Sequence, residues 1–388
     1  MSFCRHAGLT WLWIVAGPLT ALAGGPTTTE ISARGAAAQG SLAAAPDDAA
    51  TVFYNPAGLT ELRGSRVELN PLFTAAELEY DHPTASGVES NGRVLGSTLF
   101  ASTDAVDGIA LGIGIYAPFA REVRLPASPA TLGARHSTSV LRLDVAPAAA
   151  VRIGRRASIG LAVVASQVSL RSEAVGLEES SRGMGFTANV GVLVAVTQQL
   201  RVGLTYRGPL SARIEGRSSF AGARSGYHAR LRFPATAALA LAWSPTPRLT
   251  IGVALEQERW SYLRRIRRHY DDPAFPLGQT TRFDGEDALT VRIGAAIRLG
   301  ENDELRFGYA HAETTFPAGN TTPALADPEL HGFSVGYTRR VGRLSLTLMI
   351  EHVRGERRTT PNATYPGAYS ARGNAVQAGI AYSWPSDR

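Results

Sequence analysis

LTVRIGAAIRL, residues 289–299, places an apolar residue at every second position. The apolar positions are Leu289, Val291, Ile293, Ala295, Ile297 and Leu299, and the residues between them are threonine, arginine, glycine or alanine. Side chains of a β-strand point alternately to its two faces, so this stretch predicts a strand with one oily face and one small or polar face. The same alternation recurs at 200–206, 249–255, 344–350 and 376–382, and helical periodicity is nearly absent beyond residue 64.

Fourteen runs of this kind follow one another along the chain. They lie near 65–80, 92–102, 107–118, 137–153, 157–174, 184–196, 200–215, 228–243, 248–262, 286–299, 304–315, 331–340, 343–357 and 374–384. Short connections at 103–106, 154–156, 197–199, 244–247, 300–303 and 341–342 alternate with longer polar ones at 81–91, 119–136, 175–183, 216–227, 263–285, 316–330 and 358–373.

Outer-membrane barrels alternate in this way, with tight periplasmic turns and longer external loops. The pattern therefore predicts an all-β fold, a 14-stranded antiparallel transmembrane β-barrel over residues 65–388. A soluble secreted β-sandwich or β-helix is the alternative, but it needs neither runs this long nor so regular an alternation of turns and loops.

The composition excludes several other classes. The 388 residues are 44% apolar and 19% charged, with a mean hydropathy of -0.04, which fits neither a disordered chain nor a bundle of membrane helices. The chain has 39 basic and 33 acidic residues, a net charge of +6. The arginines are spread too widely along the chain to predict a nucleic-acid partner.

Residues 1–23 have the features of a secretory signal peptide. Arg5 and His6 give a basic start, residues 9–22 are largely apolar, and Ala21 and Ala23 are small enough for cleavage near Ala23. Cleavage would remove Cys4, the single cysteine, so we expect no disulfide and no thiolate ligand. The eight histidines are scattered, and we expect neither a metal nor a cofactor.

Residues 24–64 precede the first strand and are rich in small residues. A barrel of this width is too wide for its own inward side chains to fill. We therefore expect residues 24–64 to form a hatch that plugs the lumen.

The stretch GSLAAAPDDAATVFYNPAGLTELRGSRVELNP, residues 40–71, resembles the hatch and first strand of the FadL family of outer-membrane transporters (OMPP1/FadL/TodX). The Asn-Pro-Ala motif of that hatch falls on Asn55, Pro56 and Ala57. LGIGIYAPF at 111–119 is similar to the third strand of the family, and RWSYL at 259–263 to a Trp-Ser strand end. The resemblance implies passive uptake of long-chain fatty acids or other hydrophobic compounds, with hatch gating and lateral release through the barrel wall.

Two further groups of residues are candidates for function. Gly108, Gly112 and Gly114 weaken pairing of the third strand, and the resemblance implies a wall opening there. Arg264, Arg265, Arg267 and Arg268 form the densest basic cluster, in a predicted external loop. We expect these arginines to contact lipopolysaccharide phosphates or the carboxylate of a fatty acid.

No enzyme activity is expected. Gly332-Phe-Ser334-Val-Gly336 matches the nucleophile-elbow pattern, but it alternates through a predicted strand, whereas an elbow needs a sharp strand-to-helix turn. The expected protein is a monomer in the outer membrane whose partners are hydrophobic small molecules, membrane lipid and lipopolysaccharide. Two alternative functions remain open: a polar-solute porin and a surface-exposed binding or adhesion barrel.

Overall fold

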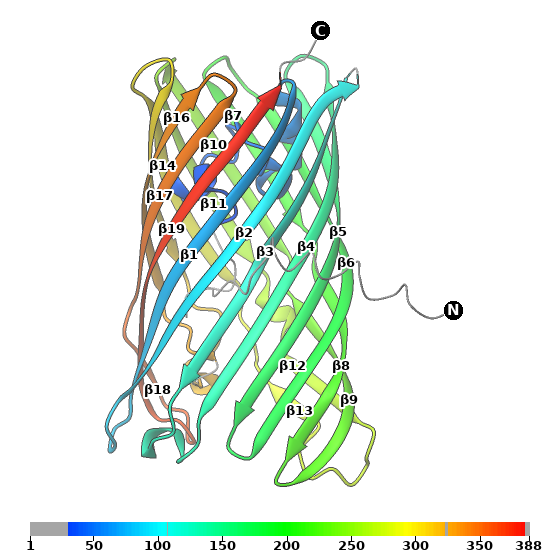
Figure 1. Ribbon diagram of the computed structural model, residues 1–388, viewed down its shortest axis with the longest axis vertical. Coiled ribbons are helices and arrows are strands. Elements are labelled where there is room, and N and C mark those ends of the chain that lie inside the picture. Colours follow the sequence, from blue (N-terminus) through cyan, green and yellow to red (C-terminus); the bar gives the residue numbers. More distant parts are fainter. Residues whose placement is uncertain (1–29, 107, 323–324, 385–388) are drawn as a thin grey trace.

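The computed structural model describes residues 30–106, 108–322 and 325–384. Its strands close into one antiparallel barrel (Figure 1), because the first strand, β1 (Ser65–Asp81), pairs with the last, β19 (Gly367–Trp384), as well as with β2 (Val88–Val106). The expected signal peptide and its cleavage site lie outside the described residues.

The remaining strands are β3 Ile109–Leu125, β4 His136–Ile153, β5 Ala157–Ala174, β6 Leu177–Ala195, β7 Leu200–Arg207, β8 Leu210–Phe220, β9 Ala223–Phe233, β10 Thr236–Thr246, β11 Leu249–Glu258, β12 Arg265–Tyr270, β13 Thr280–Arg282, β14 Ala288–Arg298, β15 Asp303–Ala312, β16 Leu330–Val341, β17 Leu344–Gly355 and β18 Arg358–Thr360. The α-helices are α1 Ala33–Ala37 and α2 Thr51–Tyr54, and the 3-10 helices are η2 Pro56–Glu61, η3 Pro129–Thr131, η4 Trp260–Tyr262 and η5 Ala318–Asn320. No helix in the described ranges is long and apolar enough to cross a membrane.

Five of the barrel strands are interrupted, so that nineteen segments form fourteen staves. The paired segments are β7 with β8, β9 with β10, β11 with β12, β13 with β14, and β17 with β18. Pro209 and Pro234 fall at two of the interruptions, where a missing N–H breaks the ladder. The predicted 14-stranded antiparallel barrel is confirmed.

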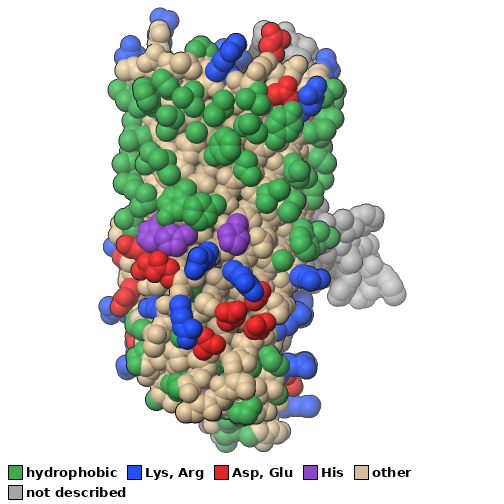
Figure 2. All heavy atoms as spheres, turned by 90° about the vertical axis from the view of Figure 1, so that its left-hand side faces the viewer, with side chains coloured by type: hydrophobic (Ala, Val, Ile, Leu, Met, Phe, Trp, Pro, Cys, Tyr) green, Lys and Arg blue, Asp and Glu red, His purple; other side chains and the backbone are tan. Residues whose placement is uncertain are grey.

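The barrel is taller than a membrane is thick. β2 and β6 have 19 residues each, or about 60 Å of strand, which at a tilt of about 40° rises about 46 Å, against a hydrocarbon core of about 30 Å. On the face drawn in Figure 2, apolar side chains cover the half nearer the short turns, and charged and histidine side chains lie over the half nearer the long loops. The long-loop half therefore projects beyond the apolar belt, and by the rule for outer-membrane barrels it is the external half.

The external ends of several strands run further than the sequence predicted. Residues 175–183 and 216–227 were expected to be loops, but β5 and β6 are joined at Val175-Gly176, and β8 and β9 at Ala221-Gly222. In these extensions charged residues occupy the outward positions, as at Arg224, so the apolar alternation fades although the pairing continues.

Residues 30–62, here called the N-terminal segment, lie inside the barrel. α1 contacts β15, β16, β17 and β19, and η2 contacts β3 to β6, so the segment spans the lumen between opposite walls. Its side chains are small, and Ala33, Ala36 and Ala37 are fully buried. Two wall glycines allow this packing, because a Cβ at Gly160 or Gly308 would clash with the backbone of the N-terminal segment.

Candidate functional site: a plugged lumen and an opening in its wall

Asn55 joins the N-terminal segment to the barrel wall. It is fully buried, its side-chain oxygen accepts a hydrogen bond from the N–H of Ala57 at 3.1 Å, and its amide donates to the carbonyl of Val192 on β6 at 3.1 Å. Pro56 begins η2, where its missing N–H leaves no donor unpaired. The carbonyl of Ala57 accepts from the hydroxyl of Ser158 on β5 at 3.0 Å. The Asn-Pro-Ala motif thus caps η2 and is hydrogen-bonded to β5 and β6.

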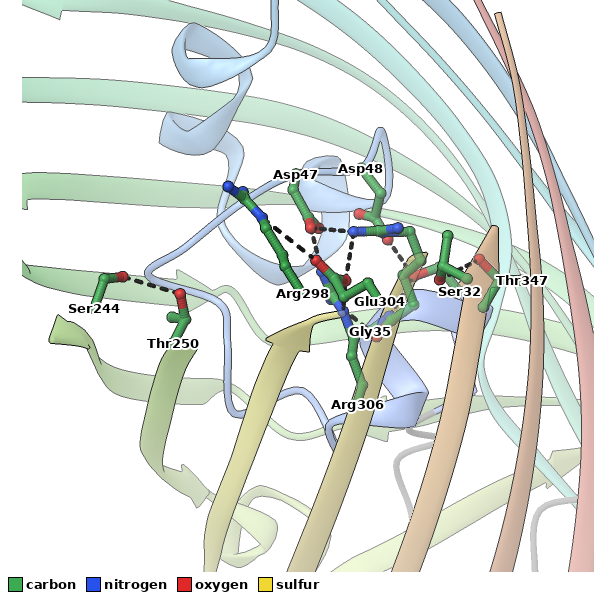
Figure 3. Close-up of polar contacts among 12 residues, drawn as sticks. Ser32, Gly35, Asp47, Asp48, Ser244, Thr250, Arg298, Glu304, Arg306 and Thr347 are labelled. Atoms are coloured by element: carbon green, nitrogen blue, oxygen red, sulfur yellow. Dashed lines mark hydrogen bonds and ion pairs between the residues drawn. The ribbon is translucent and has the colours of Figure 1, made fainter. Parts of the chain in front are cut away.

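A cluster of charged side chains holds the other end of the segment (Figure 3). Arg34, which belongs to α1, and Arg306, which belongs to β15, both bind the carboxylate of Asp47. Glu304, also on β15, accepts from Arg34 at 2.9 Å and from Arg306 at 2.7 Å. Next to this cluster, the hydroxyl of Ser32 donates to Asp48 at 2.8 Å. The sequence marked the acidic pair as part of the hatch, but it gave no sign of the β15 partners, which lie more than 250 residues away.

The two neighbouring carboxylates are placed in opposite electrostatic surroundings. Burial alone would raise the pKa of Asp47, but Arg306 and Arg34 outweigh burial and hold that pKa well below its usual range. Burial and the charge of Asp47 together raise the pKa of Asp48. Asp47 is therefore the ionised anchor of the segment.

An apolar cluster faces the lumen on the external side of this segment. Its aromatic members contact one another from wall to loop in edge-on and tilted pairs: Phe119 lies 5.2 Å from Phe233 and 6.1 Å from Trp260, and Trp260 lies 5.8 Å from Phe316, measured between ring centres. Inward residues of β8 and β9 complete it. The resemblance to a Trp-Ser strand end pointed to Trp260, whereas nothing in the sequence joined it to Phe119.

The ladder of hydrogen bonds between neighbouring strands is interrupted beside this cluster. The ladder between β2 and β3 ends at Leu99 and Ile115, although both strands continue toward the external side. Further along β3, between Tyr116 and Phe119, one extra residue forms a bulge against β4. From there β3 pairs with β4 alone, and the described part of β2 pairs with β1 alone.

Beyond the bulge β3 lies across the inner face of its former partner. Ala117 and Ala120 are buried against Leu72 and Val94, which point inward from β1 and β2. The backbone N–H of Arg124 donates to the side chain of Ser90 on β2 at 2.8 Å rather than to a β2 carbonyl. The external half of β2 therefore has one edge without a strand partner in the described residues.

The three candidate glycines lie on the periplasmic side of this break in strand pairing. Gly112 and Gly114 are paired on both sides, with β2 and with β4, and Gly108 forms the turn before β3 with a φ of 71°. A Cβ at Gly112 would meet Val52 and Leu59 of the N-terminal segment. Gly112 thus makes room for the N-terminal segment, and the break in pairing between β2 and β3 begins only after Ile115.

Strand alternation divides the arginine cluster. Arg265 and Arg267 are exposed on the outer wall. Arg268 faces the lumen, where it forms an ion pair with the buried Glu179 at 2.8 Å. The carbonyl of Arg264 accepts from the N–H of Phe283, and its side chain is exposed. The cluster is therefore not one contact surface.

These features define a closed fourteen-stave barrel with an apolar outer belt, a lumen occupied by the N-terminal segment, and an apolar cluster beside an edge of β2 that lacks a strand partner. The sequence model described as "Outer membrane protein transport protein (OMPP1/FadL/TodX)" matches residues 14–346. The chain belongs to this family, as its sequence suggested, and its place is the outer membrane.

Solved structures share the fold. A Pseudomonas aeruginosa FadL homologue superposes with a TM-score of 0.79 at 15% identity, covering 94% of this chain and 100% of that one. The P. putida toluene transporter TodX gives 0.68 at 15% identity, covering 87% and 95%. The CymD monoaromatic hydrocarbon channel gives 0.68 at 16%, covering 95% and 100%. At these identities the likeness is one of fold.

A curated sequence relative covers much less of the chain. It is an outer membrane protein, NMB0088, of Neisseria meningitidis serogroup B, 30% identical over 88 residues. The match spans 20% of this chain and 19% of the relative.

Proposed function

We propose that the protein carries hydrophobic small molecules, either long-chain fatty acids or hydrocarbons, passively across the outer membrane and releases them sideways into it. The observation that carries the proposal is the position of Phe119. This residue belongs to the lumenal apolar cluster and also ends the β3 bulge where the wall opens. A molecule held by the cluster therefore lies beside a seam that leads out of the barrel.

The N-terminal segment serves as the hatch in this proposal. Its attachment by Asn55 and by the Asp47 cluster closes the direct route through the lumen, which leaves the seam as the exit. The channel names of the similar structures, toluene transporter and monoaromatic hydrocarbon channel, favour an apolar cargo. We further propose that one chain is sufficient, because the lumen, the plug and the seam all belong to one barrel.

Uptake by cells tests the proposal. Gram-negative cells lacking their own fatty acid and hydrocarbon channels would express the wild-type protein or Asn55→Ala, and uptake of labelled oleate and of labelled toluene would be measured. Asn55→Ala removes the bond to β6, so the hatch loses its fixed resting position and we expect uptake to fall.

The matched control is Asn362→Ala. Asn362 makes similar local turn bonds, accepting from the N–H groups of Thr364 and Tyr365, but in an external loop. Its loss should leave uptake unchanged. If the folded wild-type protein takes up neither compound above the empty-vector level, the proposal is wrong.

A further inference from the structure

Five arginines that are far apart in the sequence gather on the outer wall. Arg213, Arg230, Arg232, Arg265 and Arg267 line a groove of about 430 Å³ formed by β8, β9 and β12. All five side chains are exposed, because they occupy the outward positions of their strands. The groove is separate from the lumen and from the seam between β2 and β3.

The charges of this groove are not balanced by acidic neighbours. Arg213 forms an exposed ion pair with Glu215 at 3.1 Å. Within the described residues, the other four arginines have no carboxylate at ion-pair distance. Elsewhere on the outer wall the charges are arranged differently, since Arg372 of β19 pairs with Glu77 of β1 at 2.6 Å.

The strand register places like charges directly opposite each other. Arg213 pairs with Arg230 across β8 and β9, an arrangement that destabilises a sheet unless an anion lies between the side chains. On the same outer face, two residues nearer the external end of β9 than Arg230, His228 stacks on His269 with the ring centres 5.0 Å apart. The groove is therefore built to hold negative charge.

The groove lies at the external limit of the apolar belt. Arg213 is the register partner of Met184 on β6. Met184 is 60% exposed, and Phe186, two residues nearer the membrane centre, is 70% exposed. Side chains this apolar and this exposed belong in lipid, so the arginines begin at the level of the lipid headgroups.

We propose that this groove binds the phosphate groups of a phosphorylated glycolipid of the outer leaflet, that is, the lipid A part of lipopolysaccharide. Guanidinium groups bind phosphate with two parallel hydrogen bonds. The adjoining apolar wall at Met184 and Phe186 contacts the acyl chains of the same molecule. A free phosphate ion would use the arginines but not the apolar wall. This site is independent of what the barrel transports.

The test uses delipidated protein in detergent and a quadruple variant, Arg230→Gln, Arg232→Gln, Arg265→Gln and Arg267→Gln. Affinity is measured for bisphosphorylated lipid A, for dephosphorylated lipid A and for inorganic phosphate. We expect the quadruple variant to bind bisphosphorylated lipid A roughly 700-fold more weakly than the wild type. Dephosphorylated lipid A should bind both proteins equally weakly.

A matched control changes four exposed arginines at the periplasmic turns, Arg155, Arg156, Arg340 and Arg343, to glutamine. This control should bind lipid A like the wild type. The heat-dependent shift of folded barrels on gels verifies folding. If the quadruple variant fails to fold, the pair Arg230→Gln and Arg267→Gln replaces it, with a loss of about thirtyfold.

Two results would overturn the proposal. Equal affinity of the wild type and the glutamine variant for bisphosphorylated lipid A would remove the arginines from recognition. Displacement of lipid A by an equal concentration of inorganic phosphate would make the groove a small-anion site, not a lipid site.

Discussion

Asp47 and Asp48 are adjacent in the chain and have different roles. The carboxylate of Asp47 binds Arg34 of the N-terminal segment and Arg306 of the barrel wall. It therefore links two parts of the chain that are far apart in the sequence. Asp48 accepts from Ser32 and stays within the plug. The strength with which the plug is held therefore depends mainly on the charge of Asp47.

Acid should release this attachment. The pKa of Asp47 is lowered in the folded protein relative to about 3.9 in an unfolded chain. Its stabilising contribution is therefore fully present above about pH 4 and is lost as the pH falls through the lower folded value. We expect the ion conductance of single barrels in planar bilayers to stay low from pH 7 to about pH 4, and to rise below that.

Asp47→Asn should conduct already at pH 7, because its side chain carries no charge to pair with Arg34 and Arg306. Asp303→Asn is the control, since Asp303 pairs with the exposed Arg339 on the outer wall. An Asp47→Asn protein that stays closed at neutral pH would contradict this role.

Arg121 can distinguish between the two classes of cargo. It is 9% exposed, one of its terminal nitrogens donates to the carbonyl of Ala326 at 2.6 Å, and its Nε has no hydrogen-bond partner in the described residues. A buried guanidinium with an unused donor fits the carboxylate of a fatty acid. It offers nothing comparable to an aromatic hydrocarbon.

Arg121→Leu should lower oleate uptake about tenfold, the loss expected for one charge-assisted hydrogen bond, and leave toluene uptake unchanged. Arg121→Lys keeps the charge and should restore much of the oleate uptake. Equal losses for both compounds would show that Arg121 supports the structure and does not select the cargo.

At the scale of one strand, β3 shows why the sequence located the break in pairing only roughly. Glycines at 108, 112 and 114 indicate weak pairing, and they lie next to the break, but they are themselves paired or in a turn. The break in pairing follows from the extra residue that β3 has between Tyr116 and Phe119. Whether a residue is extra depends on how many residues the neighbouring strand β4 places opposite it, and the sequence of β3 alone does not contain that number. Pro118, which lacks an N–H, is the one local sign of the break.

The same limit applies to the other sites. The alternation of apolar residues predicts the fourteen staves, and the Asn-Pro-Ala motif marks a residue that proves to be buried. Alternation could also have separated Arg265 and Arg267 from Arg268. The pairing of Arg213 with Arg230 and of Asp47 with Arg306 depends on register and on the path of the plug, which no local pattern encodes.

Removing the bulge should close the seam. Deleting Ala117 gives β3 and β4 equal numbers of residues between Tyr116 and Phe119, so β3 can continue in register beside β2. We expect a folded barrel with uptake close to the empty-vector level, measured with oleate and toluene. The control, Ala117→Gly, keeps the extra residue and should transport like the wild type. Normal uptake after the deletion would mean that cargo leaves by another route.

At the scale of the whole molecule, the barrel and its plug should be separable. The wall satisfies most of its own backbone hydrogen bonds, since β1 closes on β19 and, apart from the external edge of β2 beside β3, the staves pair with their neighbours. Several of its lumenal charges also pair with each other without help from the N-terminal segment, although Glu68 and Glu351 accept hydrogen bonds from that segment. Arg207 and Arg292 bind Glu256, and Arg306 binds Glu304. Water can solvate the polar groups that the plug covers.

Deleting residues 30–62 should therefore give a barrel that inserts and shifts on gels like the intact protein but conducts ions steadily, because the wall's own side chains do not fill a lumen of this width. Deleting 272–278, between β12 and β13, shortens an external loop, leaves the N-terminal segment in place and should leave the channel closed. A plug-free chain that fails to insert would show instead that the barrel closes around the N-terminal segment. The segment would then belong to the folding core, and gating would require movements smaller than its release.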